Sequence, residues 1–181
     1  MSLWSYTELC ELVEQGVIGP SKLEDVNGTS IDVYLGPTIM AERYSDAGQV
    51  VSLRDKQHLN MCKCVMAEGG YYDLRPSEFV LAHTVETFNL PAGISAEFKL
   101  NSSGARIGLE NALATWCDPH WHGSVLTLEL KNFSQFHTIR LHNGCRIGQM
   151  IFHRSADVPV ERGYKVRGRY NNDKSVSGVK P

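Results

Sequence analysis

The sequence lacks the features that mark several large classes of protein. Its 181 residues contain no apolar run close to the roughly 18 residues of a membrane-spanning helix. No basic residue precedes Lys22, so we expect no secretory signal peptide. The 18 basic and 20 acidic side chains nearly cancel, which excludes a chain-wide basic surface for duplex nucleic acid. We therefore expect a protein with neither membranes nor nucleic acids as partners.

Cysteine is also scarce. The odd count and the irregular spacing favour reduced thiols and a cytoplasmic protein over a disulfide framework; the five are Cys10, Cys62, Cys64, Cys117 and Cys145. The His-x-Glu and Pro-Cys-x-x-Cys signatures of zinc deaminases are absent. A chain of this length can bury a core as one domain without a disulfide or a zinc ion.

Local patterns predict one helix followed by many strands. Ser5 and Glu8 form a capping box, apolar residues then recur at helical spacing, and Gly16 is a natural stop. After Pro20, short β-branched and aromatic segments alternate with turn residues, which predicts a mainly β fold. The expected strands are Ile31–Leu35, Val50–Leu53, Glu78–His83, Ser95–Leu100, Ser124–Leu130, Thr138–Leu141 and Arg146–Phe152.

One expected strand alternates cleanly. In the segment 125–131, Leu126, Leu128 and Leu130 share one face, so Glu129 is presented on the other. Such a glutamate is usually solvated.

The basic residues are concentrated at the C-terminus. Residues 162–181 hold six basic residues and one acid, Asp173, whereas residues 1–161 hold 12 basic and 19 acidic residues. Glycines make the backbone of this segment flexible, and Tyr164 and Tyr170 supply aromatic rings. Two interpretations stay open: a solvated terminus, or a basic flap that folds over an anion.

Two further segments are rich in polar groups. In the segment 100–109, Ser102 and Ser103 precede a glycine and Arg106, which suits either an anion site or a plain turn. In the segment 118–123, His120 and His122 are two residues apart. With Cys62, Cys64, Cys117 or His153 they could form a metal site, but the signal is weak, and structural histidines are the better interpretation.

Five segments together resemble the dCTP deaminase and dUTPase family, and its deaminase branch more closely. The resemblance covers nearly the whole chain, from about residue 8 to about residue 173, and rests on these segments in this order: Ser30-Ile-Asp-Val-Tyr-Leu-Gly36, Ser102-Ser-Gly-Ala-Arg-Ile-Gly-Leu109, Asp118-Pro-His-Trp-His-Gly123, Leu128-Glu-Leu-Lys-Asn132 and Gly144-Cys-Arg-Ile-Gly-Gln149.

The resemblance implies a distorted β-barrel or jelly roll, dUTPase-like, with an N-terminal helix and a flexible C-terminal tail. Residues 1–161 would form the β domain and residues 162–181 a basic lid of the same domain. It further implies a homotrimer with sites between subunits, and Mg²⁺ held by the nucleotide triphosphate with no zinc. The implied catalytic residues are Glu129 and Arg106, and the implied substrate-binding residues are Ser102, Ser103, Thr115, Asp118, Gln149, Tyr164, Arg169 and Tyr170.

Three positions depart from the family pattern. Asn101 stands where an arginine is usual, His120 replaces a glycine, and Asp173 stands about where a glutamine is common. These changes surround the implied base and phosphate sites, so they bear on the choice of cytosine nucleotide.

The expected reaction is hydrolytic deamination of dCTP to dUTP and ammonia. Glu129 would transfer protons between the attacking water, the base and the leaving amine, and Arg106 would stabilise the Glu129 carboxylate and the anion that develops. A dUTPase, and a bifunctional enzyme that makes dUMP from dCTP, are alternatives. A further alternative is a catalytically silent nucleotide-binding trimer, since fold alone does not establish activity.

Overall fold

The computed structural model describes residues 2–55, 59–112 and 114–180. The N-terminal helix α1 spans Tyr6–Glu14 and buries Leu9 and Leu12. The Glu8 carboxylate accepts hydrogen bonds from the Ser5 N–H (2.9 Å) and the Ser5 hydroxyl (2.7 Å) at its start. Gly16, at φ +69°, follows its end, as a helix stop requires. The predicted helix is thus confirmed.

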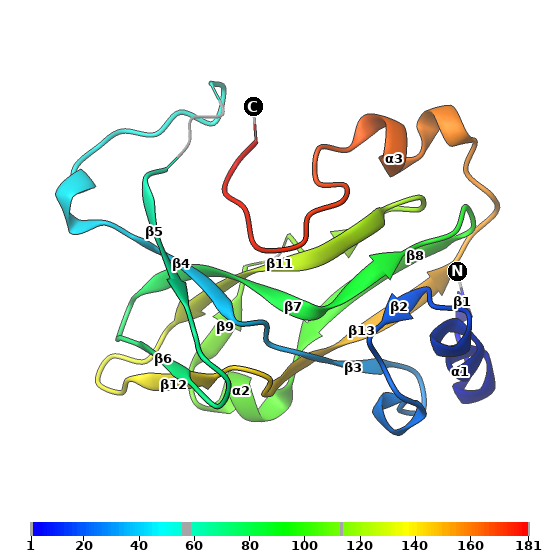
Figure 1. Cartoon of the computed structure of the whole chain (residues 1–181), viewed down its shortest axis with the longest axis horizontal. Helices are drawn as coiled ribbons and strands as arrows, with labels where there is room; N and C mark the ends of the chain where they lie inside the picture. The colour runs from blue at the N-terminus through cyan, green and yellow to red at the C-terminus, as the bar shows by residue number, and fades with distance from the viewer. Residues whose placement is uncertain (1, 56–58, 113, 181) are drawn as a thin grey trace.

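Two antiparallel sheets form the body of the molecule (Figure 1). The first has the order β1-β13-β8-β10, with β3 also paired to β13; its strands are β1 (Ser2–Leu3), β13 (Arg146–Arg154), β8 (Ile94–Leu100), β10 (Trp116–Cys117) and β3 (Ile31–Tyr34). The second has the order β5-β4-β7-β11-β9, with β2 also paired to β7; its strands are β5 (Met61–Val65), β4 (Thr38–Glu42), β7 (Phe79–Asn89), β11 (His122–Asn132), β9 (Leu109–Asn111) and β2 (Ile18–Gly19). β6 (Tyr71–Leu74) and β12 (Ile139–His142) form a separate ribbon.

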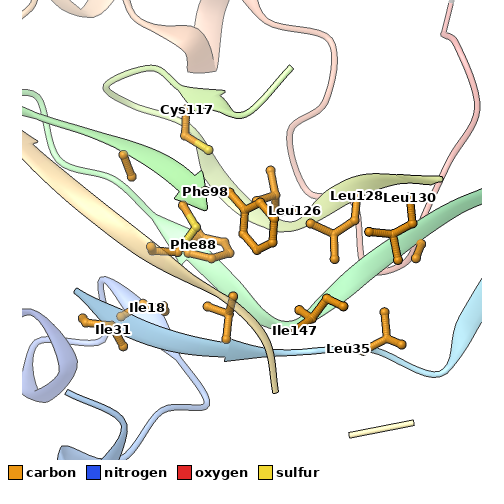
Figure 2. Packing of buried hydrophobic residues seen from close by; sticks show 14 of the residues in the cluster. Ile18, Ile31, Leu35, Phe88, Phe98, Cys117, Leu126, Leu128, Leu130 and Ile147 are labelled. Carbon is orange, nitrogen blue, oxygen red and sulfur yellow. The ribbon is translucent and has the colours of Figure 1, made fainter. Parts of the chain in front are cut away.

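The hydrophobic core lies between the two sheets. Figure 2 shows Phe88 and Leu128 of the second sheet facing Phe98 and Ile147 of the first. These four side chains are at most 3% exposed. The alternation expected in β11 is present, because Leu126, Leu128 and Leu130 are buried while Glu129 points the other way. The mainly β, jelly-roll-like fold is therefore confirmed.

The structure differs from the predicted strands in identifiable places. No strand forms at Val50–Leu53, where Val50 is 86% and Leu53 98% exposed, because this segment pairs with no other strand. The strand expected at Glu78–His83 continues to Asn89 in β7. Seven strands lie outside the predicted ones: β1, β2, β4, β5, β6, β9 and β10. The short helices α2 (Ser102–Arg106) and α3 (Tyr164–Arg167) are also additional to the prediction. Single-turn 3₁₀ helices occur at Leu23–Asp25, Tyr44–Asp46 and Val160–Arg162.

The C-terminal tail crosses over β11 at the upper side of the view in Figure 1. The Trp121 indole N–H and the Ser124 hydroxyl donate to the Tyr170 carbonyl, at 2.7 and 2.8 Å. The Val125 N–H donates to the Asp173 carbonyl at 2.8 Å. The tail thereby forms one wall above the outer face of β11. Within the described residues, no helix is long and apolar enough to span a membrane.

Candidate active site

A cavity of about 390 Å³ lies where β11, the segment 114–118 and the tail meet. Side chains of all three parts line it; they include Leu81, Trp116, Asp118, Trp121, Thr127, Glu129, Tyr164, Tyr170, Asp173 and Ser177. The volume suits a small polar ligand with a ring system. Residues of β11 and of the C-terminal tail, which are at least 30 positions apart in sequence, therefore line the same cavity.

Glu129 is the most unusual group in this cavity. Its Oε2 atom is buried and has no hydrogen-bond partner among the described residues. Burial raises the pKa of its carboxyl group to about 7. No lysine or arginine is among the described residues that line the cavity, so within one chain no cation offsets that burial. A carboxyl group with a pKa near neutrality can both accept and donate a proton at physiological pH.

Asp118 and the two tail tyrosines lie in the same cavity. Ala114, Trp116, Cys117 and Asp118 all line the cavity from one extended segment, and Cys117 is the buried member, at 4% exposure. Tyr164 follows the Val160–Arg162 turn, and its N–H donates to the Pro119 carbonyl at 3.0 Å. Four residues predicted from sequence therefore come together here: Glu129, Asp118, Tyr164 and Tyr170.

Arg106, Ser102 and Ser103 do not reach this cavity. They lie on α2, which Figure 1 places at the lower edge of the molecule, away from the tail. All three side chains are exposed. The helix is held by Asn101, whose side-chain oxygen accepts the Gly104 N–H at 2.6 Å. Asn101 thus caps a short helix where sequence alone left a plain turn open.

Gln149 lies on the α2 side as well. It is half-buried on β13, and its Oε1 accepts a hydrogen bond from the Ser30 hydroxyl at 3.1 Å. Nearby on the same strand, Arg146 forms an ion pair of 2.8 Å with Asp32. The Asn101 side chain donates to the Arg146 carbonyl at 2.9 Å, which ties this pair to α2. Gln149, Ser102, Ser103 and Arg106 therefore all lie outside the cavity, with Gln149 half-buried and the three α2 residues exposed.

The other two predicted residues lie in neither group. Thr115 is half-buried beside the cavity, and its carbonyl accepts the Phe98 N–H at 3.1 Å. Arg169 is exposed in the tail, although its neighbour Tyr170 lines the cavity.

The described residues contain no group of three or more His, Cys, Asp or Glu side chains arranged for a metal ion. The ring of His120 contacts the Val158 carbonyl through Nε2 at 2.9 Å, which is a structural role. All five cysteines are free.

Sequence reasoning missed Trp116 and Asn111. Trp116 lines the cavity and donates its indole N–H to Asp118 at 3.1 Å. Its signal was the two-residue spacing from Asp118 on an extended segment. Asn111 accepts the Glu129 N–H, and only the pairing of β9 with β11 reveals this contact.

The fold and the cavity define a protein of two packed β-sheets with a buried carboxyl group in its main cavity. Comparisons with known proteins show its family. A family model described as "dCTP deaminase-like" matches residues 3–155. The dUMP-forming dCTP deaminase of Aquifex aeolicus is 33% identical over 168 residues, which cover 92% of this chain and 87% of that protein. A dUMP-forming dCTP deaminase of Methanospirillum hungatei is 29% identical over 182 residues, covering 94% and 91%.

The chain belongs to the dCTP deaminase-like family. A solved structure of 2'-deoxycytidine 5'-triphosphate deaminase from Agrobacterium tumefaciens has the same fold, with a TM-score of 0.65 and 18% identity. The match covers 85% of this chain and 49% of that one, so this chain spans about half of its length.

The expected product is corrected by these relatives. We expected deamination of dCTP to stop at dUTP. Both relatives described above are named as dUMP-forming, and so is a third, from Dictyoglomus turgidum, which is 31% identical over 178 residues. The expectation of dUTP as the final product is therefore wrong.

Proposed function

We propose that this protein hydrolyses dCTP to dUMP, ammonia and pyrophosphate. The structural observation that carries the proposal is the buried, unpartnered Glu129 carboxyl group in a cavity sized for a nucleoside. The names of the relatives support the dUMP product. Two waters are consumed, one at C4 of the cytosine ring and one at the α-phosphate.

Glu129 is the proposed acid–base group for the ring chemistry. In its ionised form it takes a proton from the water that attacks C4. It passes that proton to N3, then takes the proton of the hydroxyl group formed at C4 and gives it to the leaving amine, so that ammonia departs and a carbonyl forms at C4. A pKa of about 7 suits both directions of transfer, because the proton is neither held nor released too strongly. Asp118, in the same cavity, is proposed to contact the sugar.

The remaining residues point to a site shared between subunits. Arg106 is the proposed partner of the Glu129 charge, yet Arg106 is exposed on α2 and does not line the cavity that holds Glu129. A homotrimer in which α2 of one subunit meets the Glu129 cavity of its neighbour would bring them together. In that arrangement the hydroxyls of Ser102 and Ser103 and the Gln149 amide face the triphosphate, and Thr115 borders the base.

The nucleotide is proposed to enter as its magnesium complex, with the metal held by the phosphates. Zinc plays no part in the proposal, since Glu129 itself can activate the water. Residues 1–161 form the nucleotide-binding domain and residues 162–181 its lid, with Tyr164 and Tyr170 over the cavity and Arg169 toward the phosphates. The free thiols suit a cytoplasmic setting.

Product analysis tests this proposal directly. The protein is incubated with dCTP and magnesium, and ammonia, pyrophosphate and nucleotides are measured over time. We expect ammonia, pyrophosphate and dUMP in equal amounts. In a second assay, labelled dCTP is supplied with an excess of unlabelled dUTP, and the label in dUTP and dUMP is measured. Label that appears in dUTP shows that dUTP leaves the enzyme before it is hydrolysed. Accumulation of labelled dUTP, or dUMP made only from added dUTP, would contradict the proposal.

A further inference from the structure

One aromatic wall of the cavity has an open ring face. Trp116 lies on β10, lines the cavity beside Asp118 and Glu129, and is 49% exposed. Because the side chain lines the cavity and is half exposed, part of its ring surface is available to a ligand there. The indole N–H is already used, because it donates to Asp118 Oδ1 at 3.1 Å. The ring can therefore turn little without losing that bond.

One face of the Trp116 ring packs against His153. The two ring centroids are 5.4 Å apart with an interplanar angle of 28°, within the range of offset stacking. His153 comes from β13, and its side chain is 16% exposed. Its Nε2 is buried without a hydrogen-bond partner and lies 3.8 Å from Glu97 Oε2 on β8. Glu97 is in turn paired with Lys99. Three neighbouring strands thus fix one indole plane.

We propose that Trp116 is the platform on which the cytosine ring stacks, and that His153 is the positioning residue that holds the indole in place. The inference deepens the proposed function and rests on it. A flat base stacks on an aromatic face whatever its substituents, so this contact contributes affinity while Glu129 and the backbone supply chemistry. The bond to Asp118 couples the platform to the residue proposed to hold the sugar.

Fluorescence quenching tests the stacking contact. We expect a Glu129→Gln background to bind dCTP without turnover. The chain has three tryptophans, Trp4, Trp116 and Trp121. We expect dCTP to quench the emission, Trp116→Phe to remove more than half of that quenching, and Trp4→Phe to leave it intact. Trp4 is the matched control because it packs against the Arg154 guanidinium, outside the cavity. Equal quenching in the two variants would overturn the proposal.

Affinity separates stacking from the bond to Asp118. Trp116→Leu removes the ring and Trp116→Phe removes only the N–H and part of the ring. We expect the dissociation constant for dCTP to rise about 5- to 150-fold in Trp116→Leu and clearly less in Trp116→Phe. The affinity for inorganic triphosphate should not change in either variant. Equal losses in both variants would assign Trp116 to holding Asp118 and refute the stacking role.

Rescue by a second ring tests His153. We expect His153→Ala to weaken dCTP binding and shift the Trp116 emission, and His153→Phe to restore both. His142→Ala is the control, since His142 makes an edge contact with Tyr71 at 5.9 Å, outside the cavity. Failure of His153→Phe to restore binding would refute the positioning role. A wild-type protein that binds no cytosine nucleotide would instead refute the proposed function itself.

Discussion

The side-chain oxygen of Asn111 accepts a hydrogen bond of 2.9 Å from the backbone N–H of Glu129. Asn111 is only 4% exposed, and its amide nitrogen donates to the Ala112 carbonyl at 2.9 Å. The Ala112 N–H returns a bond of 2.9 Å to the Glu129 carbonyl. The backbone of Glu129 is therefore fixed from β9, which leaves only its side chain free to respond to a ligand.

Substitution of Glu129 tests its proposed role. We expect Glu129→Gln to lower kcat for deamination by at least ~100-fold, because the amide keeps the shape but moves no protons. The dissociation constant for dCTP should change little. Glu110→Gln, an exposed position on β9, is the control and should retain full activity. Steady-state kinetics and calorimetric titration give the two quantities, and turnover above a tenth of wild type would exclude this role for Glu129.

A second buried carboxyl group predicts a pH dependence of stability. Glu86 is 1% exposed, accepts the Tyr34 N–H at 3.1 and 3.3 Å, and burial raises its pKa to about 7 from 4.5. The folded protein therefore holds a proton that the unfolded chain loses between these pH values, so the free energy of unfolding falls as pH rises from 4.5 to 7.

Glu86→Gln should remove this contribution. We expect the variant to be more stable than wild type at pH 8, by an amount on the order of 3 kcal/mol, and nearly equal to it at pH 5. Its side-chain oxygen can still accept the Tyr34 N–H. Denaturant unfolding at both pH values measures the difference; a gap of the same size at pH 5 and pH 8 would rule out titration of Glu86 as the cause.

Mixed assemblies test the shared site. Arg106→Ala and Glu129→Gln proteins should each be nearly inactive. Equal amounts of the two variants are unfolded, mixed and refolded, so that subunits combine at random. About a quarter of the sites would then combine an intact Arg106 with an intact Glu129 from a neighbouring subunit. We expect that fraction of wild-type activity to return. No recovery in a mixture that light scattering shows to be trimeric would place both residues in one subunit's site.

Removal of the tail tests the lid. We expect deletion of residues 163–181 to lower kcat/KM for dCTP by about 10-fold or more, because the cavity loses the wall that excludes solvent. The core between the sheets does not depend on the tail, apart from the half-buried Tyr164 that packs against it, so the melting temperature should fall by only a few degrees. A truncated protein with normal melting and normal turnover would show the tail to be a solvated terminus.

Sequence patterns predicted those parts of the fold that local rules determine. The capping box of Ser5 and Glu8 and the alternation around Glu129 depend only on neighbouring residues, and both are present. Strand β5 carries no alternation and forms through its pairing with β4, as in Ala41 opposite Cys62. Val50–Leu53 has strand-forming residues but pairs with no strand, so propensity failed there.

The site was only partly predictable from sequence, because its assembly also depends on contacts between segments that are distant in sequence. The family resemblance pointed to Glu129, Asp118 and two tyrosines that the fold brings into one cavity. It could not show that the α2 residues stay outside this cavity, because this depends on the path of the strands between them. Trp116 carries no motif, and its place became visible only with its neighbours His153 and Asp118.

The tail is anchored largely through its main chain. Trp121 and Ser124 bond to the Tyr170 carbonyl, Val125 bonds to the Asp173 carbonyl, and the Asn172 N–H bonds to the His122 carbonyl at 3.0 Å. Main-chain bonds place few demands on side-chain identity. Most side chains of this segment can therefore be exchanged without loss of these bonds, so the cavity wall that it forms can change in shape and charge while the segment stays attached to the body.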